Sequence, residues 1–309
     1  MMWIKNLFKK ELKPFDSAFL PSKDGHSIFY SQYGNPEGTP VLFFHGGPGG
    51  SAKTKYAELF DTKKYRLIMF DQRGCGNSQF KDLLDANTTA DTLSDAKRLL
   101  KTLNITQKII VYGCSWGSTL ALLFAESNPE KVKKIIVTSV FLARKYDTEW
   151  INSDSERFYP DLWATMRKIA KQQEIYPAFR KMLYSNRKKE NNTALAYLGS
   201  YEYMLGQLQP EFLPVTDEDG AQLQSARVYF HYEKNNFFLK ENQILRNIAK
   251  IHKIPTLITH NRLDFCCPLK QAWDLHTLLP RSEMVIVPDY GHVSAKLMDE
   301  TKKHINSFL

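Results

Sequence analysis

Residues 108–122 read Lys-Ile-Ile-Val-Tyr-Gly-Cys-Ser-Trp-Gly-Ser-Thr-Leu-Ala-Leu, and this stretch decides the fold. The apolar run 108–112 predicts a buried strand, and the pattern over 116–127 predicts a helix. Between them, residues 113–117 match the pattern G-x-S-x-G. Glycine on both sides of a serine permits a sharp, strained strand-to-helix turn that exposes the hydroxyl above a sheet. We therefore expect Ser115 to be a nucleophile at the end of a strand.

The chain on both sides of this turn alternates between strand and helix patterns. Strands that alternate with helices are typical of an α/β fold with a mostly parallel sheet, flanked by helices on both faces. The expected strands, besides 108–112, are 41–44, 66–70, 134–138, 254–259 and 284–287, and the expected helices, besides 116–127, are 91–103 and one that runs towards Leu309.

Residues 142–247 have a different pattern, in which aromatic and charged residues are mixed at helical spacing and strand-like runs disappear. Segments 162–182 and 194–208 are predicted to be amphipathic helices. A chain of 309 residues suits one large α/β domain with an insertion. We expect residues 1–141 and 248–309 to form the two parts of that domain, and 142–247 to form a helical cap.

The composition disfavours several classes of protein. The net charge of +9 comes from short, scattered runs of lysine and arginine, so no nucleic-acid partner is expected. No apolar stretch of 18 residues is present to cross a membrane. The lysine-rich residues 1–14 lack the apolar core of a signal peptide.

The four cysteines, Cys75, Cys114, Cys266 and Cys267, show no C-x-x-C spacing. So few cysteines in so long a chain argue against a disulfide framework. We therefore expect a cytoplasmic protein with no metal and no cofactor, and the sequence sets no oligomeric state.

A serine hydroxyl needs a neighbouring base, and that base needs a third group to orient it. With this kind of turn the chain order is serine, then acid, then histidine. Asp264 and His292 each follow a predicted strand and so lie at the sheet edge where open α/β sheets place their sites. Of the two rival aspartates, Asp274 falls in a predicted helix and Asp289 lies too close to His292 in the sequence. Ser115, Asp264 and His292 are the expected catalytic triad.

Acyl transfer also needs backbone N–H groups that meet the developing oxyanion. One is expected from Trp116, directly after the nucleophile. Another is expected from the turn His45-Gly-Gly-Pro-Gly-Gly50, which follows a predicted strand. A glycine-rich loop can instead hold phosphate, but no Gly-Lys-Ser/Thr follows this one.

Longer motifs are more specific than the turn alone. They are His45-Gly-Gly-Pro-Gly-Gly50, Phe70-Asp-Gln-Arg-Gly-Cys-Gly-Asn-Ser78, Gly113-Cys-Ser-Trp-Gly-Ser-Thr-Leu-Ala-Leu122, Ser155-Glu-Arg-Phe-Tyr-Pro160 and Cys267-Pro-Leu-Lys-Gln-Ala-Trp-Asp-Leu-His276. On these motifs the chain resembles the proline iminopeptidases, or prolyl aminopeptidases, over nearly its whole length. The resemblance implies the α/β-hydrolase fold and metal-free release of an N-terminal proline. It also implies the triad above, with Gly47 and Trp116 as oxyanion donors.

An aminopeptidase must hold the free α-ammonium group of its substrate, which calls for carboxylates in a partly dry pocket. The resemblance places glutamates on the cap helices, and Glu202 matches the first of them. Tyr229 stands at the second position, and Glu233, one helical turn further, could replace it. Both glutamates could instead be exposed helix carboxylates. Phe141 matches a residue that packs against the proline ring, whereas Ile151 stands where an aromatic residue is usual.

Three functions are compatible with these residues. The first is a serine aminopeptidase acting on small peptides with a free N-terminus, with proline or a small residue in the first position. The second keeps the triad but hydrolyses carboxylesters or other acyl compounds, and the tyrosine at position 229 motivates it. The third is a non-catalytic binding protein on the same scaffold, which the complete set of catalytic residues disfavours.

Overall fold

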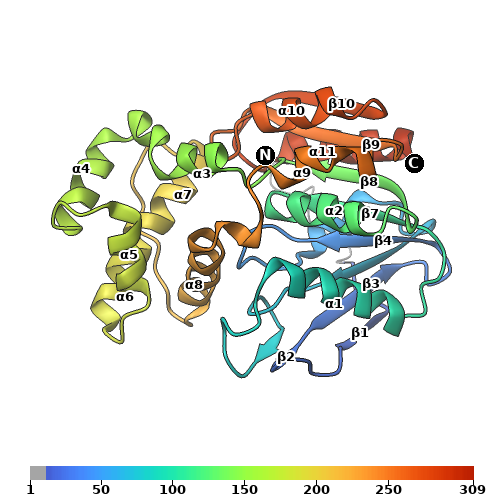
Figure 1. Ribbon diagram of the computed structural model, residues 1–309, viewed down its shortest axis with the longest axis horizontal. Helices are drawn as coiled ribbons and strands as arrows, with labels where there is room; N and C mark the ends of the chain where they lie inside the picture. Colours follow the sequence, from blue (N-terminus) through green and yellow to red (C-terminus); the bar gives the residue numbers. More distant parts are fainter. Residues whose placement is uncertain (1–11) are drawn as a thin grey trace, which may run out of the picture.

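The computed structural model describes residues 12–309, and an eight-stranded sheet runs through its larger part (Figure 1). The strand order is β1-β3-β5-β4-β7-β8-β9-β10. The pairs β1/β3 and β3/β5 are antiparallel, and all other pairs of this sheet are parallel. The strands are β1 (Asp16–Phe19), β3 (Phe29–Gly34), β4 (Thr39–Phe44), β5 (Tyr65–Phe70), β7 (Ile109–Cys114), β8 (Val132–Thr138), β9 (Thr256–Leu263) and β10 (Ser282–Tyr290), while β2 (His26–Ser27) and β6 (Gln79–Phe80) form a separate antiparallel pair.

The central strands are apolar on both faces because helices cover both. In β4, Leu42 and Phe44 pack in one core with α1, α2 and α10, while Val41 and Phe43 pack in a second core with α11. Side chains alternate across a strand, so burial on both faces gives the continuous apolar runs seen in the sequence. The helices are α1 (Thr89–Thr102), α2 (Trp116–Ser127), α9 (Gln243–Arg246), α10 (Lys270–Leu278), α11 (Ala295–Phe308), and the 3₁₀ helices Thr54–Leu59, Asn236–Phe238 and Ile248–Lys250.

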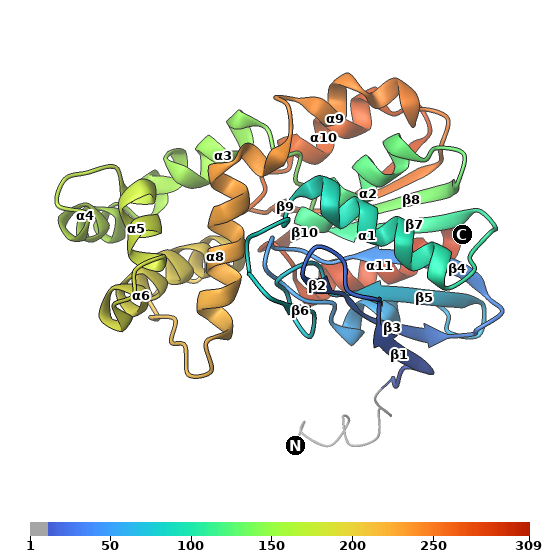
Figure 2. The same cartoon turned by 60° about the horizontal axis from the view of Figure 1, so that its bottom comes forward.

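Helices α3 to α8 are grouped beside the sheet rather than against its faces (Figures 1 and 2). They share a hydrophobic core of their own, centred on side chains such as Met166, Phe179 and Tyr201. The cap boundaries expected at 142 and 247 stay a prediction. The elements are α3 (Lys145–Asn152), the 3₁₀ helix Asp154–Phe158, α4 (Pro160–Ile169), α5 (Ile175–Leu183), α6 (Lys188–Ala194), the π-helix Leu195–Gly199, α7 (Ser200–Gln207) and α8 (Ala221–Lys234).

The predicted fold class, an α/β fold with a mostly parallel sheet, is confirmed. The prediction of one helix over 162–182 is wrong, because positive φ angles at Lys171 and Gln172 break it between α4 and α5. Strands β1 and β3 were not expected from the sequence. No helix within residues 12–309 is long and apolar enough to cross a membrane. The signal-peptide prediction concerns residues 1–14, most of which lie outside the described residues.

Candidate active site

Ser115 occupies the turn between β7 and α2, with φ 58° and ψ −127°. Its two neighbouring glycines make this turn possible. A Cβ atom on Gly113 would lie 2.0 Å from the carbonyl oxygen of Gly117, and one on Gly117 would lie 1.9 Å from the carbonyl oxygen of Phe44. Any side chain at these two positions would therefore collide with backbone. The residues of the G-x-S-x-G pattern are the ones that this strained turn requires.

The structure brings Ser115, His292 and Asp264 together from three separate parts of the chain. His292 Nε2 lies 2.8 Å from Ser115 Oγ, and His292 Nδ1 lies 2.8 Å from Asp264 Oδ2. The Asp264 side chain is fully buried, and its Oδ1 atom accepts hydrogen bonds from the backbone N–H groups of Cys266 and Cys267. This leaves Oδ2 to accept from the imidazole and to fix its orientation, as a base acting on a serine requires.

A second group of residues holds the loop that carries His292. Asn261 Nδ2 donates to the carbonyl oxygen of Gly291, which has φ +84°. Ser139 Oγ donates to the carbonyl oxygen of His292 itself, at 2.5 Å. On the other side, the N–H of His292 donates to the carbonyl oxygen of Gly206 in α7, at 2.6 Å. Sequence reasoning missed these residues, because contacts between segments so far apart leave no local pattern.

The environment of His292 favours the protonated imidazole. Burial alone lowers its pKa, but the charge of Asp264, the Cys266 thiol group and the hydrogen bond to Asp264 outweigh burial and raise the pKa to about 9. A hydrogen bond from Cys267 lowers the pKa of the Cys266 thiol. Within residues 12–309, the sulfur atoms of Cys266 and Cys267 and one ring nitrogen of His292 form the one group of three potential ligand atoms that lie within 4.8 Å of one another.

The backbone N–H groups expected as oxyanion donors belong to residues close to Ser115. Trp116 is the first residue of α2, and Gly47, with φ +127°, lines the same cavity as Ser115. Neither N–H makes a hydrogen bond to another residue between 12 and 309. A helix N-terminus and a glycine turn with free N–H groups form a suitable receptor for a negative oxygen.

Gln72 links the two segments that carry these N–H groups. Its side-chain amide donates to the carbonyl oxygen of His45 at 2.9 Å and accepts from the indole N–H of Trp116 at 3.1 Å. Its backbone N–H donates to His45 Nε2. The cap contacts the same loop, since a Cβ atom on Gly49 would lie 2.4 Å from the carbonyl oxygen of Ser225 in α8. The sequence motif around Gln72 does not reveal this role, because the contacts join distant segments of the chain.

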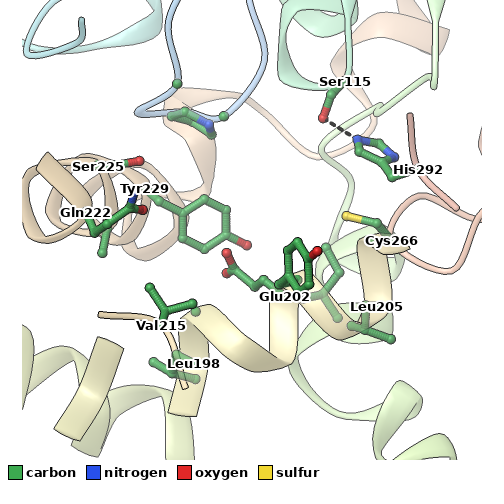
Figure 3. Close-up of a pocket in the computed structure, with 18 of the residues that line it drawn as sticks. Ser115, Leu198, Glu202, Leu205, Val215, Gln222, Ser225, Tyr229, Cys266 and His292 are labelled. Carbon is green, nitrogen blue, oxygen red and sulfur yellow. Dashed lines mark hydrogen bonds between the residues drawn. The ribbon is translucent and has the colours of Figure 1, made fainter. Parts of the chain in front are cut away.

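A cavity of about 450 Å³ lies between the cap and Ser115 (Figure 3). This volume suits a small organic substrate. Phe141, Ile151, Tyr229 and Glu202 all line it. Most of the remaining wall is apolar and comes from the cap, including Leu183, Leu195, Leu198, Leu205 and Val215.

Glu202 extends from α7 into this cavity, with its carboxylate facing the hydroxyl of Tyr229 (Figure 3). Its Oε1 atom is buried and has no hydrogen-bond partner among the described residues. Burial, followed by the nearby Cys266 and Glu233, raises the pKa of Glu202 to about 8. A buried carboxyl oxygen without a hydrogen-bond partner is costly unless a ligand completes it.

The structure does not bring Glu233 into the cavity, although its segment is helical as expected. Its carboxylate pairs with Arg180 at 2.7 Å and accepts a hydrogen bond from Asn152 at 3.0 Å. These two partners occupy both carboxylate oxygens. Glu233 is therefore engaged within the cap, and Glu202 is the carboxylate available inside the cavity.

Comparisons with known proteins agree with this architecture. Residues 39–296 match the family described as the alpha/beta hydrolase fold. A proline iminopeptidase of Arabidopsis thaliana is 36% identical, covering 94% of this chain and 80% of the relative. Another, from Xylella fastidiosa, is 37% identical, covering 91% of this chain and 92% of the relative. An α/β-fold hydrolase structure from Bacillus anthracis superposes with a TM-score of 0.63 at 18% identity, covering 95% of this chain and 99% of that one.

Proposed function

The chain belongs to the proline iminopeptidase family of α/β-hydrolases, and we propose that it releases an N-terminal proline, or a small N-terminal residue, from short peptides. Ser115 is the proposed nucleophile. The single observation that carries the proposal beyond a general serine hydrolase is Glu202, whose Oε1 atom is buried without a hydrogen-bond partner in the cavity that Ser115 also lines.

In the proposed mechanism, Ser115 Oγ attacks the carbonyl carbon of the first residue and His292 Nε2 accepts its proton. Asp264 holds the imidazole by Nδ1, and the N–H groups of Gly47 and Trp116 stabilise the oxyanion. His292 then gives the proton to the departing amine, and the acyl-enzyme forms. Water, deprotonated by His292, hydrolyses this ester in a second round of the same steps. These roles are supported by the two 2.8 Å contacts of His292.

Glu202 is proposed to bind the substrate's α-ammonium group. The pKa of Glu202 is about 8, close to that of a free peptide amine, about 7.7–8.0. A protonated Glu202 and a neutral amine therefore combine to the same ion pair as a carboxylate and an ammonium, without net uptake or release of a proton. The carboxyl group serves as an amine receptor whichever partner carries the proton beforehand. An N-blocked peptide offers no charge to pair with it.

The proposal is tested with three chromogenic substrates: proline p-nitroanilide, its N-acetyl derivative and an aryl acetate. We expect the free-amine proline amide to be cleaved far more efficiently than the blocked amide. Equal hydrolysis of both would remove the amine-binding role of Glu202 and would leave a general acyl hydrolase. Ser115→Ala is the matched control for enzyme-catalysed cleavage of each substrate.

A carboxylester hydrolase is the second candidate, and the apolar cap wall next to Tyr229 favours it. The neutral phenol supplies no second charge for an amine, and the leucine side chains around it accept an acyl chain. The aryl acetate in the same panel separates the candidates. A much higher kcat/KM for the ester than for the proline amide would favour this second function.

We also infer a reducing compartment such as the cytoplasm. Four cysteines are free, and Cys266 and Cys267 lie side by side next to the catalytic groups, where oxidation would crosslink or modify them. Cell fractionation with an antibody to the chain tests this inference. Recovery of the protein from an oxidising compartment would contradict it.

A further inference from the structure

Two adjacent thiols face the catalytic histidine, and the proposed hydrolysis uses neither of them. Cys266 and Cys267 both line the cavity, and both are free. Figure 3 shows the Cys266 sulfur in the cavity wall beside His292. Cys266 is half-buried, whereas Cys267 is almost fully buried. The pair is therefore accessible from the substrate cavity, with Cys266 forming the exposed side.

The positions of these groups suit a small cation with a preference for sulfur and nitrogen. The two Sγ atoms and a ring nitrogen of His292 lie within 4.8 Å of one another. In a tetrahedral zinc site with Zn–S bonds of about 2.3 Å and Zn–N bonds of about 2.1 Å, neighbouring ligand atoms are about 3.5–3.8 Å apart. Small rotations of the two cysteine side chains would bring the three ligand atoms from separations of up to 4.8 Å to these shorter distances. Thiolate and imidazole ligands favour Zn²⁺ over Mg²⁺ or Ca²⁺.

The hydrogen bonding around His292 also matches that of a metal-binding histidine. Histidine ligands usually donate their second ring N–H to a carboxylate, which fixes the tautomer and raises the basicity of the other nitrogen. His292 Nδ1 lies 2.8 Å from the buried Asp264 Oδ2. Nε2 therefore faces the cavity, where it lies 2.8 Å from Ser115 Oγ. The same contact with Asp264 orients the imidazole for proton transfer from Ser115 and for binding a metal ion.

We propose that Cys266, Cys267 and Nε2 of His292 bind a thiophilic divalent cation such as Zn²⁺, and that this ion switches the enzyme off. The inhibitory part rests on the proposed function, whereas the binding part does not. The ion forms bonds to two thiolates and to the Nε2 lone pair, and any proton on either thiol or on Nε2 leaves to solvent. No redox change occurs. His292 can no longer accept the proton of Ser115, and the ion occupies the space where the scissile carbonyl group must lie.

Binding is measured first, without substrate, so that it stands apart from the activity. Protein kept reduced with a non-chelating phosphine is titrated with Zn²⁺ against a chromogenic chelator. We expect one tight site per chain, which Cys266→Ala and Cys267→Ala each weaken at least about tenfold, since even outer-shell partners of a metal contribute that much. The control is His304→Ala, because His304 and Glu300 form a separate surface pair that could take up zinc adventitiously.

Co²⁺ serves as a spectroscopic probe of the same site. Thiolate-to-cobalt charge transfer in the near ultraviolet is expected for the wild type and for Ser115→Ala, and it should weaken in Cys266→Ala. Cys266 is the half-buried member of the pair, so its variant is expected to fold even if Cys267→Ala does not. Equal zinc affinity of Cys266→Ala and the wild type, or a cobalt spectrum without sulfur character, would overturn the proposed site.

Inhibition is measured second, as the rate with Zn²⁺ divided by the rate of the same variant without it. This ratio cancels any effect of a substitution on the uninhibited rate. Zn²⁺ should inhibit the wild type reversibly, with recovery on addition of EDTA, and Mg²⁺ should not. Cys266→Ala should need at least about ten times more Zn²⁺ for half-inhibition. Inhibition of Cys266→Ala at the wild-type concentration would refute the switch, even if the binding site proved correct.

Discussion

Replacing Glu202 by glutamine removes the proposed amine receptor and keeps the shape of the side chain. The carboxyl group lies in the cavity with one oxygen buried and unpartnered, so no other residue is expected to take over its charge. Glu233 cannot replace it while it is paired with Arg180. The substrate ammonium would then be buried opposite a neutral amide.

The magnitude follows from two opposing contributions. Removing one partner of a buried ion pair costs about 3–5 kcal/mol. The pKa of Glu202 is about 8, so ionising this group at pH 7 already costs about 1.4 kcal/mol, which reduces the value of the pair. About 1.5–3.5 kcal/mol remains, which corresponds to a loss of about 10- to 400-fold in kcat/KM.

The assay compares proline p-nitroanilide with the p-nitroanilide of cyclopentanecarboxylic acid, which has the same ring size but no amine. The wild type should prefer the proline compound, and Glu202→Gln should reduce that preference by about 10- to 400-fold, mostly through kcat/KM of the proline compound. Glu211→Gln, at an exposed cap residue outside the cavity lining, is the matched control. A change of less than about threefold in the preference of Glu202→Gln would refute this reasoning, since about 0.7 kcal/mol is too little for a buried ion pair.

Three other perturbations of the site have defined outcomes. The rate of hydrolysis of an aryl acetate, which has no amine, should increase with pH up to about 9, because the pKa of His292 is raised and only its neutral imidazole can act as a base. A rate that levels off below pH 7 would contradict this. Because the pKa of Glu202 is raised in the folded protein, the stability that this group contributes is fully present below its ordinary pKa of 4.5 and is lost as the pH rises through about 8. Glu202→Gln should therefore raise the melting temperature more at pH 9 than at pH 5. Equal increases at both pH values would contradict this prediction. Gly117→Ala should destabilise the fold by about 3 kcal/mol or more in urea unfolding, because its Cβ would lie 1.9 Å from a carbonyl oxygen, while Gly206→Ala, with no atom nearer than 3.9 Å, should not.

Patterns that the chain carries locally could be predicted from the sequence. The strand, turn and helix around Ser115 are fixed by an apolar run, two glycines and a run of small residues, which act over a few positions. Asp264 and His292 could be predicted because parallel strands end at the same edge of the sheet. Strands β1 and β3 were missed, because strands in which polar and aromatic residues are mixed, such as Phe29–Gly34, have no apolar run.

Contacts between side chains of distant segments could not be predicted from the sequence. Glu233 was a reasonable amine receptor from its helical spacing to Tyr229. Its partner Arg180 lies on α5, and only the packing of α5 against α8 brings the two together. Conversely, the lack of a partner at Glu202 is a property of the folded cavity. Which carboxylate is free and which is paired therefore had to come from the structure.

Active-site labelling tests most directly whether Ser115 is the nucleophile of an aminopeptidase. The protein is titrated with a fluorophosphonate, the adduct is located by peptide mapping, and proline p-nitroanilide hydrolysis is measured on the same samples. We predict a single adduct on Ser115, with the loss of hydrolysis proportional to the labelled fraction and slowed by excess proline amide. Undiminished hydrolysis by fully labelled protein, or an adduct on another residue, would contradict the claim.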